Sequence, residues 1–250
     1  PAIRDRLLLF VAEAISSFLP GGLRTDVHDQ VLATTIRLSR ETQDADAWRS
    51  YTRAFIAEFA ARGGDEYEAT VRGFAASDNP DITWRARRAL AARGLVDAGV
   101  VEAWRSADGS GEAARMSVEA LASLPIEEAR SHAWDSVYSE TLSNDFLTAT
   151  LAGLQASSWD GEAGIEAAVD RLRSYWESHT IGMALRYANG VLAYGLDIDR
   201  DGSVERSVGL LRSWLDTNGD APAQLRRIVI EHLDAFERDE RVQRRWKQDQ

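Results

Sequence analysis

Residues 131 to 155 read SHAWDSVYSETLSNDFLTATLAGLQ, and this stretch shows most clearly how the chain folds. Its first part carries apolar side chains three and four positions apart, the spacing of one helix face, at Trp134, Val137 and Tyr138. A polar segment follows, and Ser143 or Asn144 can accept the amide protons that the first turn of a second helix leaves unpaired. The stretch therefore predicts two helices joined by a capped turn, and we expect Trp134 to be buried.

The rest of the chain repeats this pattern of helical stripes and short breaks. Proline and glycine pairs and capping residues separate the stripes, and Asn79 followed by Pro80 is a helix start in which proline occupies the first turn. The first predicted helix carries an apolar stripe made of Ile3, Leu7, Phe10, Val11, Ala14, Ile15 and Phe18. Besides the second helix of the opening stretch, the predicted helices cover 3–19, 23–39, 44–62, 65–75, 82–93, 96–105, 111–122, 126–138, 161–178, 180–196, 203–216 and 221–239.

Composition supports an all-α fold. The 250 residues are 44% hydrophobic, which is enough for a sizeable core, and the sequence is rich in the helix formers Ala, Leu, Arg and Glu. Connections of a few residues make successive helices antiparallel neighbours. We predict one domain over 1–250, an α-solenoid built as a HEAT-like superhelix of antiparallel helix pairs. A compact, non-repeating helical bundle is the alternative.

Charge and cysteine content limit the classes of partner. The net charge of −11 disfavours nucleic acid, because an acidic chain repels phosphate backbones. The longest apolar run, residues 7 to 12, is too short to span a membrane, and we expect no membrane partner. The chain has no cysteine, which fits a reducing compartment, and we expect a cytoplasmic protein. It starts with Pro1 instead of Met, from which we expect a fragment of a longer protein.

No complete catalytic motif is present in the sequence. The histidines His28, His132, His179 and His232 lack a second histidine one helical turn away, so the H-E-x-x-H zinc motif is missing. There is no nucleophile elbow and no phosphate-binding loop. The adjacent carboxylates Glu127 and Glu128 diverge on a helix and cannot face each other as an acid/base pair. We therefore predict no catalytic residue and no metal ligand, and no substrate-binding residue can be named.

One acidic segment partly matches a calcium-binding loop. Acidic residues alternate at Asp197, Asp199 and Asp201 and are followed by glycine, as in the first half of such a loop. The twelfth position, which needs a bidentate glutamate, is Val208, and Glu205 at the ninth position is a partial substitute. The alternative is an ordinary connection in which Asp201 or Ser203 caps the next helix, and the sequence does not decide whether the Asp197 to Asp201 segment binds calcium.

Several stretches in order give the chain a resemblance to a known family. They are ITWR at 82–85 with RALAARG at 88–94, the segment 129–137 with AWDSV at 133–137, TLSN at 141–144 leading to GLQ at 153–155, YWESH at 175–179, and LRR at 225–227 with Glu231 and Asp234. Together they span about residues 3 to 241. The chain resembles the C-terminal helical domain of aminopeptidase N-type zinc metallopeptidases, the region also found in the endoplasmic-reticulum aminopeptidases, and the actinobacterial members are most similar. Ser143 stands where the family usually has proline.

The resemblance implies a function without catalysis by this chain itself. In that family the zinc, its H-E-x-x-H motif and the loop that reads the substrate amine belong to upstream domains. The helical domain forms a cap over the active-site chamber, limits access to peptides and contacts their distal ends. The implied partners are the upstream catalytic domain and peptide substrates, zinc is implied only in that upstream domain, and the chain alone is expected to be inactive as a peptidase.

Two other functions remain open at this stage. Helical periodicity fits equally well a free-standing HEAT-like scaffold that binds a peptide or protein on its concave face. A third and more remote hypothesis is an all-α hydrolase that uses His132 or His179.

Overall fold

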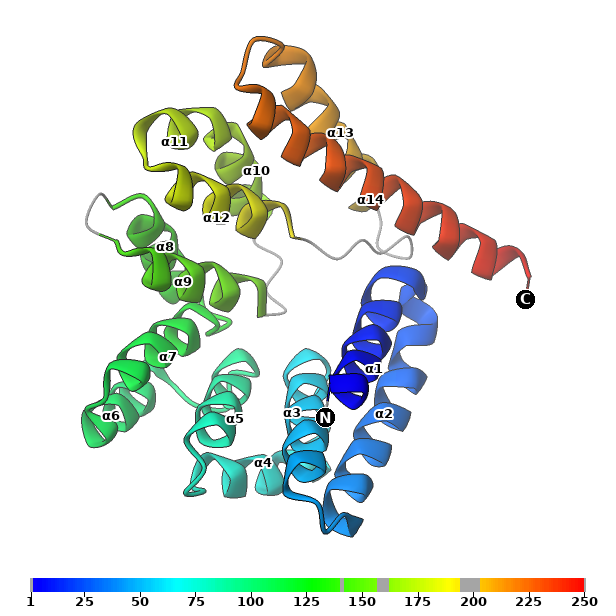
Figure 1. Ribbon diagram of the computed structural model, residues 1–250, viewed down its shortest axis with the longest axis vertical. Helices are drawn as coiled ribbons and strands as arrows, with labels where there is room; N and C mark the ends of the chain where they lie inside the picture. Colours follow the sequence, from blue (N-terminus) through cyan, green and yellow to red (C-terminus); the bar gives the residue numbers. More distant parts are fainter. Residues whose placement is uncertain (1, 140–141, 157–161, 194–202, 250) are drawn as a thin grey trace. The chain divides into compact units, whose positions relative to one another are not determined.

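The computed structural model describes residues 2–139, 142–156, 162–193 and 203–249 (Figure 1). Every regular element within these described ranges is a helix, which confirms the predicted all-α class. The chain divides into two compact units, of which unit 1 comprises 1–10 and 27–159 and unit 2 comprises 11–26 and 160–250. The prediction of one domain over 1–250 stays a prediction.

Most predicted segments correspond in approximate position to helices of the structure. The helices at the start of the chain, parts of which belong to each unit, are α1 (Ala2–Glu13), the π-helix η1 (Ala14–Phe18) and α2 (Gly21–Glu41). Unit 1 continues with α3 (Ala45–Ala61), the 3-10 helix η2 (Asp65–Tyr67), α4 (Glu68–Ala75), α5 (Pro80–Ala92), α6 (Ala98–Asp108), α7 (Gly111–Ala122), α8 (Glu127–Val137) and α9 (Asn144–Ala156). Unit 2 contains α10 (Glu162–Asp170), α11 (Leu172–Ser178), α12 (Ile181–Leu192), α13 (Ser203–Thr217) and α14 (Ala223–Gln248).

Capping side chains fix where many of these helices begin. Asn79 accepts a hydrogen bond from the Ile82 amide at the start of α5, with Pro80 in the first turn, as predicted. The Ser143 hydroxyl accepts from the Phe146 amide at 3.3 Å, which confirms the predicted capped turn before α9. Helix starts are predictable because they depend on a few residues close together in the sequence.

Several helices differ from their predicted ranges, and two of the differences concern unit 2. The predicted helix 161–178 is interrupted at Arg171, which separates α10 from α11. Helix α14 runs to Gln248, beyond the predicted end at 239. The apolar stripe fades there, but the polar Gln243 is fully buried, and its side-chain amide donates to the Ser17 carbonyl at 2.8 Å. A buried polar contact therefore extends the packed face of α14 past the last apolar position.

In unit 1 the helices pack as successive pairs. Each of α4, α6 and α8 contacts the helix that follows it, which gives the pairs α4/α5, α6/α7 and α8/α9 (Figure 1). The second helix of each pair also contacts the second helix of the next pair, and α3 precedes them in this row of α3, α5, α7 and α9. The core of unit 1 follows the row, since α3 and α5 contribute Phe55, Ile56, Phe59, Ile82 and Leu90 to one buried cluster.

The structure corrects the expected burial of Trp134. That side chain is only half-buried and stacks on Tyr138, with ring centroids 6.1 Å apart. Helix α8 instead turns Arg130, Ala133 and Val137 inward. The Arg130 guanidinium donates to the Leu154 carbonyl in the last turn of α9 at 3.3 Å, where helical carbonyls lack partners within the helix. Val137 belongs to the predicted stripe, whereas Arg130 and Ala133 are inward positions that a search for large apolar side chains does not find.

The predicted apolar stripe at the start of the chain is well buried only further along, where Ile15 is 2% exposed. Ile3, Leu7 and Phe10 on α1 are 79%, 60% and 61% exposed. Periodicity identifies the apolar face of a helix, but it does not show whether another element covers that face.

Unit 2 is held together by α12 and α14. Helix α12 contacts α10, α11 and α14, while α14 also contacts α13 and η1. The Tyr187 hydroxyl on α12 donates to the Ala168 carbonyl on α10 at 2.8 Å. Asp239 on α14 is buried, and burial raises the pKa of its carboxyl. Polar side chains therefore contribute to the packing of unit 2 alongside its apolar core.

Candidate functional site: a pocket between helices α7, α8 and α9

The four histidines have different surroundings. His28 is paired through Nδ1 with the largely buried carboxylate of Glu58. The His179 ring stacks on Tyr175 at 3.8 Å between centroids. His232 is half-buried on α14, and burial lowers the pKa of its imidazole. Within the residues that the structure describes, no group of three His, Cys, Asp or Glu side chains could hold a metal ion.

The calcium-like segment Asp197 to Asp201 lies outside the described residues. At the twelfth position of that pattern, Val208 is buried in α13 with 7% of its surface exposed. Glu205, which was considered a partial substitute for the missing glutamate, is exposed on the first turns of α13. Calcium binding by this segment stays an open hypothesis.

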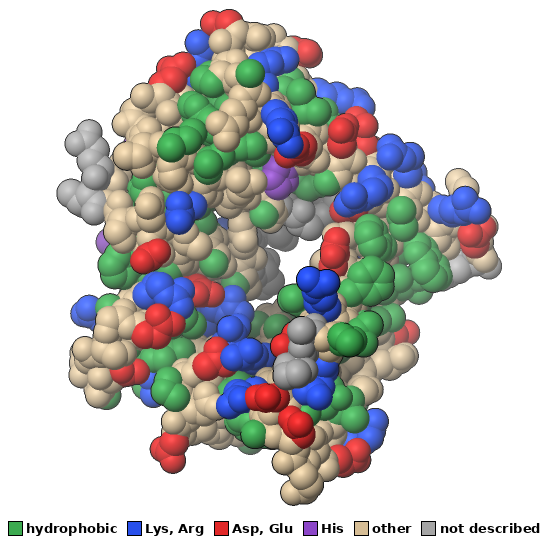
Figure 2. All heavy atoms as spheres, in the orientation of Figure 1, with side chains coloured by type: hydrophobic (Ala, Val, Ile, Leu, Met, Phe, Trp, Pro, Cys, Tyr) green, Lys and Arg blue, Asp and Glu red, His purple; other side chains and the backbone are tan. Residues whose placement is uncertain are grey.

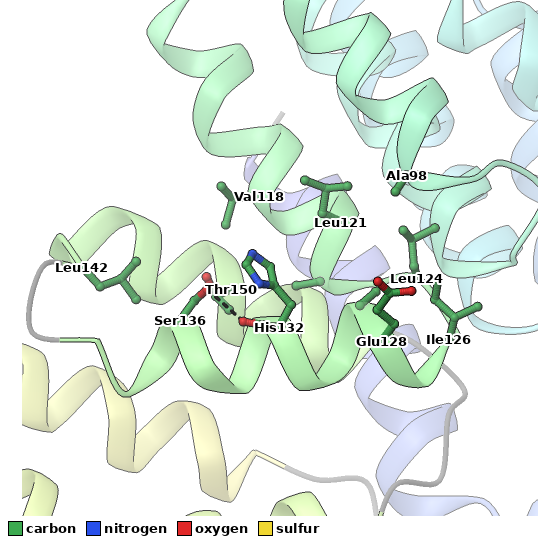
Figure 3. A pocket seen from close by; sticks show the side chains of 13 residues that line it. Ala98, Val118, Leu121, Leu124, Ile126, Glu128, His132, Ser136, Leu142 and Thr150 are labelled. Carbon is green, nitrogen blue, oxygen red and sulfur yellow. Dashed lines mark hydrogen bonds between the residues drawn. The ribbon is translucent and has the colours of Figure 1, made fainter.

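His132 lines a cavity. A pocket of about 350 Å³ opens between α7, α8 and the start of α9, and Figure 3 shows the His132 ring projecting from α8 toward the side chains of α7. The wall is almost entirely apolar. The lining residues are Ala98, Val118, Leu121, Ala122, Leu124, Ile126, Glu128, Ala129, His132, Ala133, Ser136, Leu142 and Thr150.

Small residues at the helix crossings explain the shape of this region. Gly153 on α9 lies against α7, where a Cβ atom at that position would be 2.3 Å from the Glu119 carbonyl oxygen. Close contact of α7 with α9 is therefore possible only without a side chain. Beside this contact, Ala122, Ala129 and Ala133 line the pocket with single methyl groups, which leaves room between α7 and α8.

Polar groups follow one edge of the pocket. Glu128, His132 and Ser136 are spaced four residues apart, so they lie along one face of α8. The Ser136 hydroxyl donates to the His132 backbone carbonyl at 2.9 Å, a bond that serine commonly forms within a helix. Within the described part of the chain, no hydrogen bond joins the His132 ring to either of the other two side chains. Nucleophilic catalysis uses a hydrogen bond between the nucleophile and its base, which the side chains of Ser136 and His132 do not form here, since the Ser136 hydroxyl bonds the backbone carbonyl instead.

A second hollow adjoins the pocket. It has a volume of about 500 Å³ and lies where the α5–α6 connection meets the α7–α8 connection. Leu124 and Ile126 line both hollows, and Ile126 is 47% exposed. The two hollows together, defined by the residues of both linings, are called the α6–α8 groove below. Apolar hollows with a few polar groups at their edge are the usual form of ligand sites.

Sequence reasoning did not find this site. It named His132 only for a remote hydrolase, and it considered Glu128 only as a partner of Glu127. The structure directs the two carboxylates apart, since Glu128 lines the pocket and Glu127 is not among the lining residues. The four-residue spacing of Glu128, His132 and Ser136 was a usable signal, but a pocket depends on helix packing that no local pattern contains.

The surface shown in Figure 2 has acidic and basic side chains interspersed, with no continuous basic patch on the described residues of that face. Among the described helices, none is both long enough and apolar enough to cross a membrane. Neither a comparison with models of protein families nor one with curated proteins finds a match for this chain. The resemblance to the aminopeptidase helical domain therefore rests on the sequence stretches alone.

Proposed function

We propose that this chain is a non-catalytic, peptide-binding helical module, the C-terminal cap domain of an aminopeptidase N-type zinc metallopeptidase. The observation that carries peptide binding is the apolar pocket between α7, α8 and α9, with Glu128 and His132 at its edge. Apolar pockets with a few polar groups at the rim are the usual form of ligand sites. In the proposal, zinc and the catalytic residues come from an upstream domain of the same polypeptide, and the location is cytoplasmic.

The packing of unit 1 supports a HEAT-like arrangement as part of this proposal. Pairs α4/α5, α6/α7 and α8/α9 stack through their second helices, which is how solenoid repeats bury a continuous core. The second hollow of the groove lies along the connections between successive pairs, α5–α6 and α7–α8. A module of this kind presents an extended surface to a peptide without needing catalytic residues of its own.

Peptide binding is tested with a short fluorescein-labelled Gly/Ser peptide that carries a single phenylalanine. We expect binding to the wild-type chain, and we expect Val118→Asp to weaken it roughly tenfold or more, because the ring would have to pack against a charge. Fluorescence anisotropy measures the affinity. Ala114→Asp is the matched control, since it places the same charge one turn earlier on α7, away from the lining residues.

Equal affinity of the Val118→Asp variant and the wild-type chain would contradict peptide binding at this site. The same mixtures, with and without added zinc, test whether the chain itself lacks peptidase activity. We expect mass spectrometry to show intact peptide, because the chain supplies no metal-activated water. Zinc-dependent cleavage by the purified chain would overturn that expectation.

A free-standing scaffold with the same binding surface is the second candidate function. The two candidates differ in the gene that encodes the chain. A coding region for an H-E-x-x-H domain in frame upstream of Pro1 supports the cap domain, whereas a start codon immediately before Pro1 supports the scaffold.

A further inference from the structure

Glu128 gives the pocket a charge that peptide binding alone does not explain. Among the described residues that line the pocket, it is the one acid, and it is exposed at the edge of an apolar wall. We infer that the α6–α8 groove selects peptides in which a basic side chain neighbours a large apolar one. This inference rests on the proposed peptide-binding function and specifies its ligand.

The carboxylate of Glu128 is available to a ligand. Two acids of the neighbouring helix α7 are already paired, since Glu119 forms an ion pair with Arg88 at 3.1 Å and Glu112 pairs with Arg115. Within the described residues, the Glu128 carboxylate forms no ion pair and accepts no hydrogen bond. A carboxylate without a partner beside apolar surface attracts a cation more strongly than one whose charge is compensated.

The adjoining hollow adds no free positive charge. Its single basic residue, Arg72, pairs with Glu68 at 2.7 Å and donates to the Leu95 carbonyl at 3.0 Å. The other charged residue of that lining is Asp97, whose carboxylate caps α6 by accepting from the Val100 amide at 2.9 Å. The groove therefore has a surplus of negative charge, in a chain whose net charge is −11.

The positions of these groups define the order of contacts. Figure 3 shows the Glu128 carboxylate close to Leu124 and Ile126, which are the residues shared by both hollows. The apolar pocket lies on one side of Leu124 and Ile126, along the His132 ring. A large apolar side chain in the pocket would thus place the next side chains of an extended peptide at Glu128, where lysine or arginine finds an unpaired carboxylate.

Two labelled peptides that differ in one residue test this inference. Both carry phenylalanine in a Gly/Ser background, and the residue after it is lysine in one peptide and glutamine in the other. Because Glu128 is exposed, we expect the lysine peptide to bind about three- to fivefold more tightly at low salt, with the difference shrinking as salt is added. Glu128→Gln should abolish the difference. Glu127→Gln removes the same charge one residue away, off the lining, and should preserve it.

The outcomes separate this inference from the function on which it rests. If both peptides bind the wild-type chain with equal affinity, and Val118→Asp still weakens both, the charge selection is wrong and peptide binding stands. If neither peptide binds, both are wrong. A preference for lysine that Glu127→Gln reduces as much as Glu128→Gln would assign the effect to net charge and would also overturn the role of Glu128.

Discussion

Gly153→Ala is expected to destabilise unit 1 by about 2 to 3 kcal/mol, although alanine is the better helix former. The added Cβ would lie 2.3 Å from the Glu119 carbonyl oxygen and 2.7 Å from the Ala122 Cβ. The first of these atoms belongs to the backbone of α7, so no side-chain rotation relieves the overlap, and the two helices must separate. Urea unfolding followed by circular dichroism measures the loss.

Gly73→Ala is the matched control for this prediction. Gly73 is exposed within α4 of the same unit, and a Cβ there would meet no atom within 4 Å. The same substitution should stabilise at this position by up to about 1 kcal/mol, because alanine costs less backbone entropy in a helix than glycine. Equal effects at the two glycines would show that α7 and α9 do not approach as closely as described.

Trp84→Ala is expected to cost about 3 to 5 kcal/mol of the free energy of unfolding. The Trp84 side chain is 1% exposed, and its ring nitrogen donates to the Asp108 carboxylate at 2.9 Å. The Arg87 guanidinium lies 4.8 Å from the centre of the ring. Removal of the ring would leave a large cavity under α5 and would also remove the aromatic face beneath a cation. Urea unfolding again provides the measurement.

Trp134→Ala serves as the comparison and should cost only about 1 kcal/mol. Its ring is half-buried and loses mainly the stacking contact with Tyr138. Trp84→Phe should fall between the two variants, because it retains most of the buried ring and loses the hydrogen bond to Asp108. A loss at Trp134 as large as that at Trp84 would contradict the orientation of α8.

The contrast between these two tryptophans shows what the sequence could and could not predict. The existence and limits of α5, α7 and α9 follow from apolar spacing and from capping residues such as Asn79 and Ser143, all of which are local signals. The inward face of α8 includes Arg130, whose guanidinium donates to the Leu154 carbonyl on another helix. A distant polar contact of this kind does not appear in any local pattern.

The candidate site was beyond local patterns for the same reason. Gly153 has no side chain and so allows α9 to pack closely against α7. Alanines on α7 and α8 leave room for the pocket beside that contact. Catalytic and metal-binding motifs consist of histidines, acids and nucleophiles at fixed spacings, and this sequence contains no complete motif of that kind. The sequence therefore predicted correctly that the chain is helical, while the position of a binding surface became visible only with the helices packed.

The most direct test of a peptide site between α7, α8 and α9 is hydrogen exchange, measured by mass spectrometry with and without the phenylalanine–lysine peptide. Bound peptide should slow exchange in the segment 118–136, which contains most of the pocket lining, and should leave α13 and α14 unchanged. Slower exchange confined to α13 and α14, or no change anywhere at saturating peptide, would contradict the proposed site.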